Sequence, residues 1–94
     1  MTVVSPVSAS NSLSRHSLWP TISSYYDMPL HRLSTEIALM RKDLEYYKSR
    51  NDEKSHRLAV EAYNRLNVLF QLYSEKSGRP LETVRDMYGN PTLY

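Results

Sequence analysis

Apolar residues recur at helical spacing from residue 30 onward. We call the first set, spaced by three and four residues, the first seam: Leu30, Leu33, Ile37, Met40, Leu44 and Tyr47. Side chains at these intervals share one face of an α-helix, in a narrow stripe of coiled-coil type. Pro29 suits the first helical turn, and Asp27 just before it could accept the free backbone N–H groups. The sequence therefore predicts a helix over about 29–50.

A broader apolar stripe follows. This second seam consists of Leu58, Ala62, Leu66, Leu69 and Tyr73, and it is widened by Ala59, Tyr63 and Phe70. The spacing predicts a helix over about 52–77, ended by Gly78. Because one neighbouring helix would not cover so wide a stripe, we expect the second seam to contact something outside the chain.

The polar run between the seams, residues 49–55, allows two architectures. As a turn, it would place Asn51 in the left-handed conformation that ends the first helix, while Asp52 caps the second. As continuous helix, it contains no Gly or Pro, the seams stay in phase, and pairs such as Lys48/Asp52 and Glu61/Arg65 have helical spacing. A helix through residues 30–76 would greatly exceed the usual length, so the turn is favoured.

A short third helix is predicted over about 80–88, from Pro80 at its first turn to Gly89 at its end. The predicted fold class is therefore all-α, an antiparallel helical hairpin with this third helix and an extended N-terminal tail. We expect a helical interaction domain over residues 28–94 and a serine-rich tail over residues 1–27. About 65 residues is near the size at which a single core is marginally stable, which favours a partner or self-association.

The tail differs sharply in composition from the rest of the chain. Residues 1–26 contain eight serines, two prolines and no acid, with Arg15 as the only Lys or Arg. A flexible or partner-ordered tail is the favoured interpretation. An organellar targeting segment is the alternative, although such segments are usually richer in arginine.

Large apolar side chains gather at the end of the tail, over residues 18–28: Leu18, Trp19, Ile22, Tyr25, Tyr26 and Met28. Trp and Tyr are frequent binding hot spots because they bury a large area while fixing few torsions. Docking on a protein partner and folding back over the chain's own helices are equally compatible with this pattern.

The bulk composition excludes several function classes. Without cysteine, the chain forms no disulfide framework, thiolate zinc site or cysteine nucleophile. No apolar run approaches the roughly 18 residues of a membrane span. We expect an intracellular, soluble protein that does not bind a membrane, cytoplasmic by default and organellar if the tail is a targeting segment.

Catalytic, metal and cofactor signatures are also missing from the sequence. Glu53 and His56 form a Glu-x-x-His pair of the kind used in di-iron bundles, but they lie at the polar junction, where solvated surface is the favoured interpretation. The serines stand in no Gly-x-Ser-x-Gly elbow, and the two glycines, Gly78 and Gly89, are explained by helix ends. The sequence predicts no enzyme, metal ion or cofactor.

A run of basic residues provides the alternative function. This basic ridge consists of Arg41, Lys42, Lys48, Arg50, Lys54 and Arg57. Acidic residues are interleaved with it, and the net charge of the chain is only +2, so the field that attracts phosphate is weak. Nucleic-acid binding is possible but not favoured.

The favoured function is a non-enzymatic interaction or assembly subunit that binds a protein partner in a larger complex or forms a homo-oligomer. The candidate partner-binding residues are the large side chains of the tail and of the second seam: Leu18, Trp19, Ile22, Tyr25, Tyr26, Leu58, Ala59, Tyr63, Leu66, Phe70 and Tyr73.

Overall fold

The computed structural model describes residues 16–94, and within them the chain forms helices and no strand. The elements in chain order are η1 (His16–Leu18), α2 (Ile22–Tyr25), α3 (Leu30–Lys48), α4 (Glu53–Ser77) and α5 (Leu81–Met87). The predicted all-α class is confirmed. The first fifteen residues of the predicted tail lie outside the described residues.

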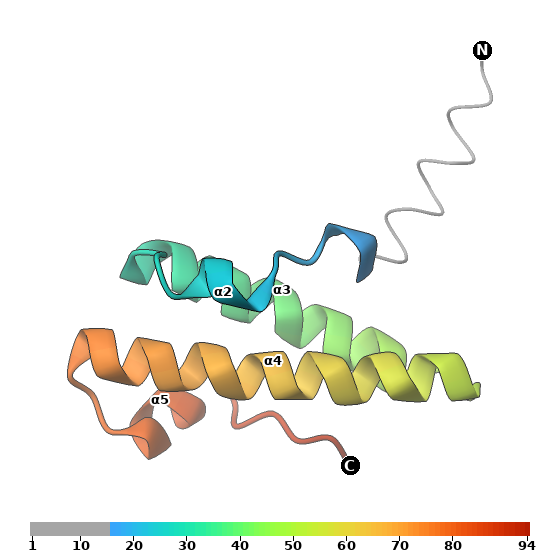
Figure 1. Cartoon of the computed structure of the whole chain (residues 1–94). Helices are drawn as coiled ribbons and strands as arrows, with labels where there is room; N and C mark the ends of the chain where they lie inside the picture. The colour runs from blue at the N-terminus through green and yellow to red at the C-terminus, as the bar shows by residue number, and fades with distance from the viewer. Residues whose placement is uncertain (1–15) are drawn as a thin grey trace, which may run out of the picture.

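The two long helices, α3 and α4, lie side by side and run in opposite directions (Figure 1). Four non-helical residues, 49–52, connect them, so the junction is a turn and not continuous helix. Each long helix begins and ends within two residues of its predicted bounds.

The ends of α3 differ from expectation in two details. Pro29 occupies the N-cap position with an extended conformation, and no side chain caps the helix. The expected capping by Asp27 is therefore wrong, because proline holds the capping position and offers no side-chain acceptor there. At the other end, Ser49 stays right-handed and its hydroxyl donates to the carbonyl of Tyr46. The left-handed conformation expected at Asn51 is also wrong, since Ser49 already bonds the last carbonyls of the helix.

The ends of α4 follow expectation. The carboxylate of Asp52 accepts hydrogen bonds from the backbone N–H and the hydroxyl of Ser55, at 3.0 and 2.9 Å. These bonds lower the pKa of Asp52 below its ordinary value. Gly78 ends the helix at φ 76°, a left-handed conformation that costs glycine little.

The core lies between α3 and α4 and is formed by the seams. Its fully or almost fully buried side chains include Leu33, Ile37, Met40 and Leu44 from α3, and Ala62, Leu66, Leu69 and Phe70 from α4. On the far side, α5 contributes the buried Val84, and Tyr88 packs against Phe70 with ring centroids 6.0 Å apart. The second seam therefore finds much of its cover within the chain.

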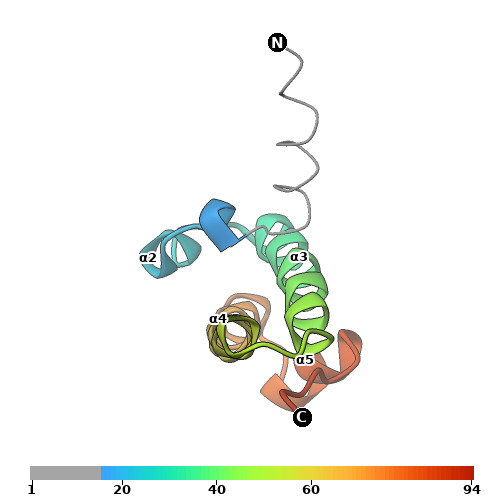
Figure 2. The same ribbon diagram turned by 90° about the vertical axis from the view of Figure 1, so that its right-hand side faces the viewer.

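Residues 16–28, which we call the strap, lie on the opposite side of the α3 and α4 pair from α5 (Figure 2). The strap contains η1 and α2, and its Tyr25 side chain is fully buried in the core. This part of the sequence, expected as the end of an extended tail, is folded onto the helices.

Candidate interaction surface

Trp19 fixes the first half of the strap to α3. Its indole Nε1 donates a hydrogen bond of 2.7 Å to Oδ2 of Asp43, a carboxylate only 6% exposed. The indole ring also meets the Tyr47 ring edge-on, with centroids 6.2 Å apart. A hydrogen bond to a charged acceptor away from water is among the stronger single contacts in a protein. The indole is therefore held both by its polar edge and by its ring.

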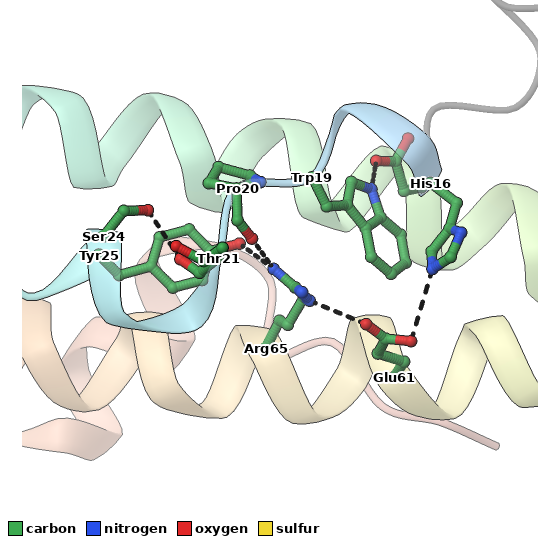
Figure 3. Close-up of polar contacts among 9 residues, drawn as sticks. His16, Trp19, Pro20, Thr21, Ser24, Tyr25, Glu61 and Arg65 are labelled. Carbon is green, nitrogen blue, oxygen red and sulfur yellow. Dashed lines mark hydrogen bonds and ion pairs between the residues drawn. The ribbon is translucent and has the colours of Figure 1, made fainter.

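Arg65 fixes the strap to α4 (Figure 3). Its Nη1 donates to the carbonyl of Pro20 and, at 3.0 Å, to the hydroxyl of Tyr25. Its guanidinium carbon also lies 5.2 Å from the centroid of the Trp19 ring. The planar guanidinium thus joins three residues of the strap, an arrangement that the point charge of lysine would not reproduce.

The carboxylate of Glu61 orients Arg65 and reaches the start of the strap. Its Oε2 accepts from Nε of Arg65 at 3.2 Å, while its Oε1 lies 3.6 Å from Nε2 of His16 (Figure 3). The expected Glu61/Arg65 pair is confirmed. This ion pair also helps to hold the strap, because both residues contact it.

The second half of the strap is held by one lysine from the last turn of α4. Nζ of Lys76 donates to the carbonyls of Tyr26 and Met28, at 2.8 and 2.7 Å. Between this contact and Arg65, Tyr25 is inserted into the core, and burial raises the pKa of its hydroxyl despite the opposing bond from Arg65. Contacts at both ends and in the middle thus define the position of the strap.

Three large apolar side chains of the strap remain exposed. Leu18, Ile22 and Tyr26 are 65%, 38% and 56% exposed. Tyr26 also borders a groove of about 300 Å³ beside α4, with Val68 and Leu72 among its lining residues. Polar side chains complete the lining of the groove: Asn67, Gln71 and Glu75. The strap and this groove form the candidate interaction surface.

The other predicted partner-binding residues are more enclosed. Tyr25, Ala59, Leu66 and Phe70 are buried within the chain. Trp19, Leu58, Tyr63 and Tyr73 are partly buried and pack against the core. The three exposed residues of the strap are therefore the members of the predicted set with the most surface left for a partner.

The members of the basic ridge differ in burial and in their contacts. Arg41 is partly buried, and its Nη2 would lie 3.3 Å from a Cβ at Gly89. Lys48 donates to the carbonyl of Thr92, and Arg50 bonds the carboxylate of Asp52. The remaining members, Lys42, Lys54 and Arg57, are exposed. Four of the six cations, Arg50 among them, are thus exposed, and Arg41 and Lys48 are partly buried.

Glu53 and His56 are both exposed at the start of α4. Within residues 16–94, no three His, Asp or Glu side chains come together in a way that could hold a metal ion. The same residues contain no helix with the length and apolar character required to cross a bilayer.

Comparison with known proteins gives no family for this chain: no family model, curated protein or solved structure matches it.

Of the two anchors of the strap, Arg65 was expected only as the helical partner of Glu61, and Asp43 was not singled out from the sequence. Asp43 and Glu36 are seven residues apart beside the first seam, and both are buried. Acidic residues repeated at this spacing next to an apolar stripe were a usable signal, because a buried carboxylate requires a donor. The only tryptophan of the chain supplies one of these donors.

Proposed function

We propose that this chain is a non-enzymatic interaction or assembly subunit that binds a protein through the outer surface of the strap. The helical hairpin, with α5 behind it, serves to present this surface. The bound protein is a partner in a larger complex or a second copy of the chain. The single observation that carries the proposal is the exposure of Leu18, Ile22 and Tyr26 on a segment anchored at both ends.

Physical reasoning supports this assignment in two ways. Exposed apolar side chains on an ordered segment, one of them bordering a groove, are typical of protein-binding sites. Anchoring by Asp43, Arg65 and Lys76 also lowers the entropy that binding would cost, because the segment is already ordered.

The test compares two matched double variants of the full chain. Leu18→Ser with Ile22→Ser removes apolar surface from the strap, and Leu81→Ser with Met87→Ser removes exposed apolar surface from α5. The residues of the two pairs are 65% and 38% exposed in the strap, and 39% and 47% exposed in α5. Sedimentation measures self-association at micromolar concentration, and quantitative co-purification measures bound proteins.

We expect the strap variant to lose self-association or the binding of a partner protein, whichever the wild type shows. The α5 variant should retain it. Far-UV circular dichroism must show both variants folded, which is expected because the substituted side chains lie outside the core. Equal retention of association in both variants would overturn the assignment to the strap. A wild-type chain that stays monomeric and retains no specific partner would overturn the proposed function itself.

A further inference from the structure

A second concave site lies where α3, α4 and the C-terminal segment meet, away from the groove beside the strap. It encloses about 280 Å³. Its apolar lining is formed by Tyr47, Ala59 and Leu93, of which Tyr47 and Ala59 are buried and Leu93 packs against the core. Ligand sites typically combine such an apolar floor with a few polar groups, at volumes from about 300 Å³ upward. At about 280 Å³ this site is at the small end of the range, which suits a small compound.

The charged side chains that line this site are cations. Lys48 and Arg50 contribute to the lining together with His56 and Tyr94, and no lining side chain is a carboxylate. Two carboxylates nearby offset part of the positive charge, because Glu45 lies 3.5 Å from Nζ of Lys48 and Asp52 lies 3.3 Å from Nε of Arg50. The rim is thus cationic, with acids beside it.

Donor capacity remains on the rim after these contacts. Nζ of Lys48 has three protons, and its contacts are the carbonyl of Thr92 and the carboxylate of Glu45. Arg50 uses Nε for Asp52 and Nη1 for the hydroxyl of Tyr46, which leaves Nη2 available. An anion could therefore accept hydrogen bonds here without displacing the bonds that organise the junction.

We propose that this site binds a small anion that carries an aromatic ring, such as an aryl phosphate. The ring packs on the floor formed by Tyr47 and Leu93, and the anionic group accepts from Arg50 and Lys48 with His56 beside it. The floor distinguishes this site from a general attraction of anions to positive charge. The proposal is independent of the function proposed for the strap.

The test uses phenyl phosphate as the probe, followed by NMR titration of the full chain. Inorganic phosphate supplies the anion without the ring, and benzyl alcohol supplies a ring without the charge. We expect phenyl phosphate to produce saturable shifts at Ala59 and Leu93, with an affinity at least about tenfold above that of either control compound. The shifts locate the ring, because both residues belong to the floor.

Substitutions then separate specific contact from overall charge. Arg50→Gln and His56→Gln each remove a group of the rim, and Arg57→Gln removes the same charge as Arg50→Gln from an exposed residue next to His56 that lies outside the lining. We expect the first two variants to lower the affinity for phenyl phosphate by about tenfold, or about 1.4 kcal/mol. Arg57→Gln should leave this affinity nearly unchanged. Because Arg50 also bonds Asp52, circular dichroism is used to check that Arg50→Gln is folded. His56→Gln provides a second variant of the rim.

Three results would overturn the proposal. The first is the absence of saturable shifts at Ala59 and Leu93. The second is equal binding of inorganic phosphate and phenyl phosphate, which would make the floor irrelevant. The third is equal weakening by Arg57→Gln and by the rim variants, which would reduce the effect to long-range charge.

Discussion

The indole N–H of Trp19 donates to the carboxylate of Asp43 across 2.7 Å, and so ties together two residues 24 positions apart. The carboxylate belongs to the buried side of α3, whereas the indole comes from a segment with the composition of a tail. The contact is therefore one of those that hold the strap against the folded body.

Trp19→Phe should lower the free energy of unfolding by about 1–3 kcal/mol, because it keeps an aromatic ring but leaves the buried Asp43 carboxylate without the indole donor. Urea denaturation followed by far-UV circular dichroism measures the change. Tyr46→Phe is the control, since its hydroxyl contacts the exposed Arg50 and its loss should change stability little. An unchanged stability in Trp19→Phe would mean that the contact does not hold the strap.

The periodic part of the chain was predictable because helical spacing depends on local sequence. The first seam residues Leu33, Ile37 and Leu44 are fully buried, as their spacing of three and four requires. The Asp52 cap and the Gly78 terminus were predictable for the same reason, since each acts within one helical turn. Such features need no knowledge of distant parts of the chain.

The position of the strap could not be predicted, because it depends on contacts between residues far apart in the sequence. Tyr25 meets Arg65 across 40 positions, and Trp19 meets Asp43 across 24. The composition of the tail indicated flexibility, and its aromatic residues were equally compatible with a partner. In the structure, Trp19 and Tyr25 contact the chain's own long helices, α3 and α4.

Arg65→Lys should loosen the strap although the charge is retained. Lysine lacks the planar group that bonds Tyr25 and Pro20 while it lies beside the Trp19 ring. Trp19 is the only tryptophan of the chain, so its fluorescence reports directly on this segment. We expect the emission to shift to longer wavelength, as for an indole more exposed to water, and the free energy of unfolding to fall by about 1–3 kcal/mol.

Arg57→Lys provides the matched control for this experiment, because Arg57 is an exposed arginine of the same helix. Its emission maximum should equal that of the wild type. If Arg65→Lys also leaves the emission unchanged, the strap is held without the guanidinium of Arg65.

Asp52→Asn should reduce the loss of stability in acid. Hydrogen bonds from Ser55 lower the pKa of Asp52, so its carboxylate stabilises the fold above the ordinary pKa of the group. This contribution disappears as pH falls through the lowered pKa. Asparagine caps helices about as well but does not titrate. Thermal melts between about pH 6 and pH 2 should therefore show a smaller decrease in melting temperature for Asp52→Asn than for the wild type.

The exposed carboxylate of Asp27 offers a control for the acid experiment, since it lies outside the helices and caps none of them. Asp27→Asn should follow the wild-type decrease. An equal decrease in Asp52→Asn and the wild type would show that the cap does not contribute to the acid dependence.

Tyr25→Phe should have opposite consequences at neutral and alkaline pH. At neutral pH it removes the hydroxyl that accepts from Arg65 at 3.0 Å, and the free energy of unfolding should fall by about 1 kcal/mol. Burial raises the pKa of Tyr25 in the folded state. The unfolded chain therefore releases this proton first, and the stability from the neutral hydroxyl is lost as pH rises above about 10. Phenylalanine has no proton to release, so the variant should lose less stability between about pH 8 and pH 11.

Tyr26→Phe is the matched control for this pair of effects, because Tyr26 is the next residue and is 56% exposed. Urea denaturation at each pH gives the slope of the free energy of unfolding against pH in the alkaline range. We expect the same slope in Tyr26→Phe and the wild type, so that a smaller slope in Tyr25→Phe is specific to the buried residue. If Tyr25→Phe has that slope as well, the buried hydroxyl does not titrate differently in the folded and unfolded chain. In that case the bond from Arg65, which lowers the pKa of Tyr25, fully offsets the effect of its burial.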